Sequence, residues 1–173
     1  MKNKKGFTLV ELLAVIVVLA IIMIIAVPSV LNSMTDARRN SFAVYGEKLI
    51  NSAQAQSQAT AMVNGTIKKC YTVSELVDGA HGTYEGYVQR LVHGEKEYYF
   101  LTLRDANYAA VNILAQELEA VKSGVQTTYK THVIVGRDTI DADTEGKKVD
   151  FTKCPETPTV SETDIPNTTT TTS

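Results

Sequence analysis

The feature that most constrains this chain is an uninterrupted apolar run near its amino terminus. No residue from Leu12 to Val27 is charged or strongly polar, and the run ends at Pro28. Counted from Phe7, about twenty helical residues at ~1.5 Å each span roughly 30 Å, which is the thickness of a bilayer core. We therefore expect one membrane-spanning helix in this part of the chain.

The charges around this run predict its orientation. Three lysines stand on its short N-terminal side: Lys2, Lys4 and Lys5. Positive charge stays on the cytoplasmic side of a spanning helix, so everything after Pro28 is expected outside. A cleaved secretory signal fits less well, because its apolar region should be about 7–15 residues long and the proline makes a poor cleavage site. A simple signal anchor explains the length and the lysines, but it leaves Glu11 unexplained.

A single carboxylate, that of Glu11, stands between Phe7 and the long apolar run. An acid at the centre of a spanning helix costs on the order of 2.5–3.5 kcal/mol. One explanation is local, because Thr8-Leu9-Val10-Glu11 has the form of a capping box, in which the acid binds free N–H groups at a helix start. This explanation leaves room for a second role, because the helix must begin near here in either case.

The residues Lys4-Lys5-Gly6-Phe7-Thr8-Leu9-Val10-Glu11-Leu12-Leu13 resemble the processing signature of type IV prepilins and pseudopilins. That signature is a short basic leader ending in Gly, then Phe, then Glu five positions after the Gly, then a long apolar helix. Pro28 also falls where the family has a helix-disrupting proline. The resemblance covers roughly residues 1–60 and implies cleavage after Gly6 by a membrane peptidase, which also methylates the new amino group of Phe7.

The implied cleavage would change the charges at the start of the chain. It removes the three lysines and creates an α-amino group on Phe7. In a filament of this family, that ammonium is expected to meet Glu11 of a neighbouring subunit, in an apolar core where an isolated charge is heavily penalised. The intersubunit role and the capping role of Glu11 are compatible, and both stay open at this point.

Downstream of Pro28, where a helix is expected to bend or loosen, the pattern predicts an amphipathic helix that continues to about Met62. Asn64-Gly65 is a good helix stop. Spacing and turn residues then predict further elements: a short helix at 72–79, a hairpin of strands 83–92 and 96–104, a helix at 111–121, and strands at 127–135 and 149–152. The expected fold is α+β, a type IV pilin fold in which a long helix, apolar in its first half and amphipathic in its second, packs on an antiparallel sheet.

We expect four segments: a leader at 1–6, a transmembrane and filament-core helix at 7–28, the amphipathic helix and globular head at 29–154, and a flexible Thr-rich tail at 155–173. The tail sequence has low complexity and cannot bury enough apolar surface to order itself. Its threonine run either accepts sugars or stays unmodified.

The two cysteines, Cys70 and Cys154, are expected to pair if the chain is exported. A bridge between them closes a loop of roughly 85 residues and contributes about 4–5 kcal/mol in the chain-entropy model. The alternative is two free buried thiols.

Asp141, Asp143 and Glu145 are spaced like the start of a calcium loop. Thr152 stands where the twelfth-position acid belongs, so a solvated acidic turn is the simpler interpretation. The sequence contains no H-E-x-x-H, phosphate-loop, G-x-S-x-G or C-x-x-C motif, and we expect neither an enzyme nor a cofactor. A net charge of −2 and an acidic last third argue against nucleic-acid binding.

These features predict a structural subunit of a type IV pilus, stored in the membrane and then polymerised outside the cell for adhesion, surface motility or biofilm formation. The resemblance implies further copies of the chain, a prepilin peptidase, a membrane platform protein and an assembly ATPase as partners, and a Gram-positive, clostridial-type major pilin. Three alternatives remain: a pseudopilin of a competence or type II secretion system, a minor or adhesive pilin, and a membrane-anchored surface binding module that keeps its leader.

Overall fold

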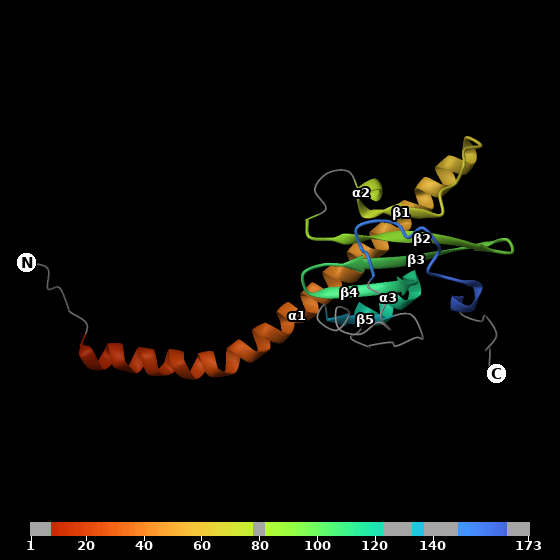
Figure 1. The fold of residues 1–173 in the computed structure, drawn as a ribbon. Coiled ribbons are helices and arrows are strands. Elements are labelled where there is room, and N and C mark those ends of the chain that lie inside the picture. The colour runs from red at the N-terminus through yellow and green to blue at the C-terminus, as the bar shows by residue number, and fades with distance from the viewer. Residues whose placement is uncertain (1–7, 78–81, 123–132, 137–148, 166–173) are drawn as a thin grey trace, which may run out of the picture. The chain divides into compact units, whose positions relative to one another are not determined.

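The computed structural model describes residues 8–77, 82–122, 133–136 and 149–165 (Figure 1). Its first element is α1 (Leu9–Met62), a helix of 54 residues with Pro28 in its interior. The helix does not end at the proline, although the ring removes one backbone hydrogen bond. The chain forms two compact units, which divide between Arg38 and Arg39.

The first unit holds the apolar part of α1. Every large apolar side chain from Leu9 to Met34 in this unit is between 49% and 79% exposed. A helix this apolar on all sides is not stable in water by itself, because its side chains find no core to enter. The described part of this unit is therefore suited to a lipid environment or to packing against other helices.

The second unit begins where α1 meets the sheet. The buried residues of α1 all lie in this second half: Phe42, Ala43, Gly46, Leu49, Ile50, Ala53 and Ser57. Steps of three and four residues place these side chains on one face of the helix. The predicted amphipathic half of the helix, and its end at Met62, are confirmed.

In the part of the chain that the structure describes, the sheet has five antiparallel strands, in the order β1-β2-β3-β4-β5. The strands are β1 (Cys70–Thr72), β2 (Glu85–His93), β3 (Lys96–Arg104), β4 (Tyr108–Ile113) and β5 (Val133–Gly136). Two short helices, α2 (Val73–Leu76) and α3 (Ala115–Lys122), follow β1 and β4. The long helix and the antiparallel sheet confirm the expected α+β arrangement (Figure 1).

The central hairpin turns within two residues. His93 pairs with Lys96, which leaves Gly94-Glu95 as the loop. Gly94 has a φ of 62°, and a glycine with positive φ at the first loop position matches a type II′ turn, whose twist fits that of the flanking strands. The predicted hairpin around residues 93–95 is confirmed.

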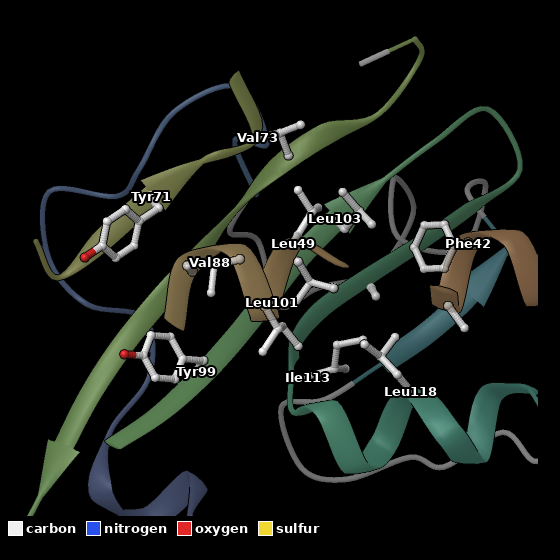
Figure 2. Packing of buried hydrophobic residues seen from close by; sticks show 14 residues of the cluster. Phe42, Leu49, Tyr71, Val73, Val88, Tyr99, Leu101, Leu103, Ile113 and Leu118 are labelled. Atoms are coloured by element: carbon white, nitrogen blue, oxygen red, sulfur yellow. The ribbon is translucent and has the colours of Figure 1, made fainter. Parts of the chain in front are cut away.

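Alternation along β3 separates two cores. Tyr99, Leu101 and Leu103 belong to the larger core beneath α1, where Phe42 and Leu49 lie over the sheet (Figure 2). Phe100 faces the other way and joins a smaller core with Leu114 and Val160. Successive side chains of a strand point to opposite faces of the sheet, so β3 contributes to both cores.

The two cores differ in size and in the elements that line them. The larger core is lined by apolar side chains from α1, α2, α3 and the strands, including Ile113 and Leu118 (Figure 2). The smaller core lies beneath residues 149–165, which we call the C-terminal strap. Each fully buried aliphatic or aromatic side chain in such a core contributes about 1.5–3 kcal/mol.

Several sequence predictions are corrected by the strands. The predicted helix at 111–121 is wrong in its first part, because Val111–Ile113 belong to β4 and α3 begins only at Ala115. The strand β1 was not predicted, and the predicted strand at 149–152 is wrong, because no strand is assigned there. The strand predicted at 127–135 overlaps β5, and residues 127–132 lie outside the described part.

The end of α1 has the hydrogen bonds of a Schellman motif. The amide of Gly65 donates to the carbonyl of Thr60 at 2.9 Å, and the amide of Asn64 donates to that of Ala61 at 3.1 Å. Asn64 has a φ of 52°, the left-handed conformation that this cap needs. The stop predicted at Asn64-Gly65 is confirmed.

The C-terminal strap differs from the expected tail. A flexible tail was predicted from Pro155, but Val160 is only 5% exposed and packs with Phe100 and Leu114. A short 3-10 helix follows at Glu162–Asp164. Pattern analysis missed this packing because one buried valine in a polar segment produces no periodicity. Residues 166–173 of the expected tail lie outside the described part.

Candidate processing and assembly site

The amino-terminal site is built on the first turn of α1. Thr8 donates its backbone N–H to Oε2 of Glu11 at 2.9 Å and its hydroxyl to the same oxygen at 2.8 Å. The amide of Glu11 in turn donates to the Thr8 hydroxyl at 3.3 Å. These reciprocal bonds form the capping box that the spacing predicted, and they satisfy donors that a helix start leaves free.

The capping box holds the carboxylate at a fixed place relative to the chain start. Glu11 stands three residues after Thr8, and both residues are exposed. A carboxylate held at the N-terminal end of a helix is also favoured by the helix dipole. In a single chain, the capping role of Glu11 therefore explains why a carboxylate stands at the start of an apolar helix. Gly6 and Phe7, the residues of the predicted cleavage and methylation, lie outside the described part.

The helix behind this cap meets the requirements for a membrane span. Within the described residues, α1 is the one helix that is long and apolar enough to cross a bilayer, and its apolar window is not buried inside the protein. About twenty such residues suffice for the hydrocarbon core. A capped start, one acid and an exposed apolar helix are compatible with insertion in lipid and with packing against other helices.

The comparisons with known proteins address the same segment. Residues 1–27 match the family model described as the prokaryotic N-terminal methylation motif. Comparison of the chain with curated proteins and with solved structures finds no match. The chain thus carries a type IV pilin-like prepilin signature, which marks a type IV pilin-like or pseudopilin-like precursor anchored in the membrane. The motif implies processing by a prepilin peptidase and handling by membrane assembly machinery.

A disulfide joins the edge strand of the head to the C-terminal strap. Cys70 on β1 and Cys154 are bonded, with their Cα atoms 6.1 Å apart and a sequence separation of 84. The pairing is the one that the two cysteines of the sequence suggested, and it excludes the alternative of free thiols in the described structure. The bridge holds the strap beside β1 and β2, because Cys70 pairs with Gln89 in the sheet.

The sequence does not predict a polar network that lies between the sheet and the strap, where Gln89 and Asn112 are buried and Thr159 is exposed. Its centre is the Thr159 hydroxyl, which lies 2.8 Å from Oε1 of Gln89 and 3.0 Å from Oδ1 of Asn112. The Asn112 amide donates to the Thr102 hydroxyl at 3.1 Å. Asn112 has a φ of 53°, and the register of β3 and β4 shifts close to it. In the sequence, the one sign of this register shift is an asparagine within a strand. Asparagine adopts the left-handed backbone conformation more readily than most residues.

Charged groups near the hairpin end of β2 and β3 form a small cluster. Arg90 and Tyr99 both donate hydrogen bonds to the Glu97 carboxylate. These bonds, the one from Arg90 first, lower the pKa of Glu97 to about 2. This arrangement is structural, because it joins neighbouring strands β2 and β3 and holds its carboxylate ionised.

The calcium-loop hypothesis for the acidic turn stays a prediction. Asp141, Asp143 and Glu145 lie outside the described residues. Among the residues that are described, no group of three or more His, Cys, Asp or Glu side chains could hold a metal ion.

Proposed function

We propose that this chain is the structural subunit of a type IV pilus. In this proposal the membrane stores the precursor, a prepilin peptidase cuts after Gly6 and methylates Phe7, and the mature chains polymerise into an extracellular filament. The single observation that carries the proposal is the methylation motif at residues 1–27, which leads directly into a helix whose apolar side chains are exposed.

The exposed helix gives this proposal its physical basis. Its side chains lose contact with lipid when the subunit leaves the membrane, so they need a new apolar environment. Other copies of the same helix supply one, and a bundle of them forms the filament core. The Glu11 carboxylate then needs a partner, and the α-amino group of Phe7 in a neighbouring subunit is the cation that cleavage creates.

The proposed partners follow from this sequence of events. They are further copies of the chain, a prepilin peptidase, a membrane platform protein and an assembly ATPase. We propose no catalytic reaction and no cofactor for the chain itself. The proposed setting is the surface of a Gram-positive cell, and the proposed roles of the filament are adhesion, surface motility or biofilm formation.

Mass spectrometry of the native amino terminus tests the proposal. The expected result is a chain that begins at Phe7 with one methyl group on its amino nitrogen. A chain that keeps Met1, or one cut near Ser29, would contradict the proposal and would favour a membrane-anchored binding module.

Shearing of intact cells separates the pilus from its nearest alternative. A major pilin is expected as the dominant protein of long sheared fibres. A correctly processed chain that stays with the envelope in short rods would indicate a pseudopilin, and a trace component of the fibres would indicate a minor or adhesive pilin.

A further inference from the structure

The dipeptide Asn64-Gly65 combines chemical reactivity with a structural role at the end of α1. It is the one Asn-Gly pair in the sequence. Both residues are exposed, and the next residue, Thr66, is exposed as well. A glycine after asparagine leaves the backbone nitrogen unhindered, because glycine has no Cβ. That nitrogen is therefore well placed by sequence to attack the Asn64 side-chain amide.

We propose that Asn64 is a site of spontaneous deamidation whose rate is set by the cap of α1. The Gly65 backbone nitrogen loses its proton and bonds to Cγ of Asn64, and ammonia leaves as a five-membered succinimide forms. Water then opens the ring to aspartate or isoaspartate. The atoms balance with one water consumed and one ammonia released, and no oxidant or reductant is needed.

The Schellman motif opposes this reaction in the folded chain. The nucleophile is the same Gly65 N–H that donates to the Thr60 carbonyl at 2.9 Å. A nitrogen that donates its proton to a carbonyl is a poor nucleophile until the bond opens. Attack also requires Asn64 to leave the left-handed conformation that its φ of 52° records. The reaction therefore proceeds through opening of the last helical turn, which is a low-energy event at a helix end.

Conversion of Asn64 to aspartate or isoaspartate weakens the cap of α1 that slowed the reaction. Aspartate places a negative charge at the C-terminal end of the helix dipole, where it is unfavourable. Isoaspartate adds a methylene group to the main chain between the two amides of the cap, so both hydrogen bonds cannot keep their register. Conversion of Asn64 is thus expected to fray α1 back toward Thr60.

Peptide mass spectrometry of the full-length chain in detergent, incubated at mildly alkaline pH, tests the proposal. The expected result is replacement of an amide by a carboxyl group at Asn64, faster in denaturant than in the folded chain. The chain also supplies internal controls, because three Asn-Ser pairs lie within α1 at Asn32, Asn40 and Asn51. These sites are expected to react more slowly than Asn64 in the folded chain.

Variants distinguish control by the cap from simple sequence reactivity. Ala61→Gly weakens the last turn and leaves Asn64-Gly65 intact; the propensity difference predicts roughly a fivefold faster reaction. Ala55→Gly makes the same change two turns earlier, also at an exposed position, and should leave the rate unchanged. Equal rates in all three folded chains, or equal rates in folded and denatured chains, would overturn the proposal. A sugar on Asn64, whose Asn-x-Thr context is a glycan-acceptor pattern, would also overturn it, because that amide could no longer leave.

Discussion

The hydroxyl of Thr159 donates to Oε1 of Gln89 at 2.8 Å, across 70 residues of sequence. Gln89 is 3% exposed, so its carbonyl oxygen has no easy access to water. The contact fixes the C-terminal strap on the face of the sheet opposite α1. A polar contact in a nearly buried place specifies position more strictly than an apolar one, because its loss leaves an unpaired group.

Replacing Thr159 with valine should destabilise the head. The change keeps the shape of the side chain but removes the donor to Gln89, and a buried acceptor left without a partner costs about 1–3 kcal/mol. Denaturant unfolding of the wild type and of Thr159→Val measures the difference. Thr157→Val is the matched control, because Thr157, like Thr159, is an exposed threonine of the strap, and it lies two residues away. An equal loss in both variants would show that the network contributes nothing specific.

The capping and assembly roles of Glu11 can be separated by a pair of variants. Thr8→Ala removes the capping partner and keeps the carboxylate, whereas Glu11→Ala removes both. Loss of a cap costs about 0.5–2 kcal/mol, and both variants should still insert in the membrane. Because the proposed function pairs Glu11 with Phe7 of a neighbour, Glu11→Ala should assemble poorly and Thr8→Ala should still form fibres. The yield of sheared fibres measures this, and normal fibres from Glu11→Ala would leave only the capping role.

Removing the bridge between Cys70 and Cys154 should lower the free energy of unfolding. A loop of this length contributes about 4–5 kcal/mol in the chain-entropy model, and the strap would also lose its covalent hold beside β1. Denaturant unfolding of the double variant Cys70→Ala, Cys154→Ala measures the loss. The wild type in a reducing agent should behave like the double variant. An unchanged midpoint under reduction would show that the strap is held by its other contacts alone.

Two glycines should respond differently to the same substitution. A Cβ at Gly86 would lie 2.2 Å from the backbone oxygen of Thr102, and the sheet would have to move to accommodate it. A Cβ at Gly46 would meet Cδ2 of Leu101 at 2.7 Å, which is the end of a side chain that can rotate. Overpacking costs about 1–3 kcal/mol, and at Gly46 the gain in helix propensity offsets about 1 kcal/mol of it. Thermal unfolding should therefore show a larger loss for Gly86→Ala than for Gly46→Ala, and the reverse order would contradict the packing described here.

Acid should weaken the head partly through Glu97. Its pKa falls from 4.5 to about 2 on folding, first because of Arg90 and then because of Tyr99. A carboxyl group with a lowered pKa stabilises the fold above its unfolded pKa, and this stabilisation is lost as the pH falls from about 4.5 to about 2. The Glu97 side chain is 37% exposed, so solvent screening reduces the effect to under about 1 kcal/mol.

The free energy of unfolding as a function of pH checks this prediction. Glu97→Gln should flatten the slope in that window, and Tyr99→Phe should flatten it less, because it removes only the second donor. A slope that both variants leave unchanged would show that other carboxyl groups account for the acid sensitivity.

Much of the fold follows from local signals in the sequence. The length of α1, its end at Met62 and the hairpin at Gly94 each rest on short-range chemistry: an apolar run, an Asn-Gly stop and a tight turn. The candidate site at Thr8 and Glu11 follows from four consecutive residues. Such features can be predicted because the interactions that form them lie within one or two turns of chain.

The failures have a common physical cause. Val111–Ile113 fit a helical apolar spacing, yet they form the end of β4, which pairs with β3. Pairing with a neighbouring strand overrides the local helix propensity. Residues 155–165 of the strap were predicted as part of a flexible tail, because their ordering depends on Gln89 and Asn112, which lie far away in sequence. The left-handed φ of Asn112 likewise accompanies a register shift in the sheet. The residues next to Asn112 in the sequence do not predict this shift.

The sequential order of the strands has a consequence for how the head is made. Each strand from β2 to β5 pairs with the one before it, so a chain exported from its anchored end, as the proposed function requires, would find the previous strand already outside. Folding can then keep pace with export, without long loops that wait for a distant partner. Among the described contacts, the bridge forms late, since Cys154 has to return to Cys70 across a sequence separation of 84. Oxidation of that pair would thus mark a head delivered at least as far as Cys154.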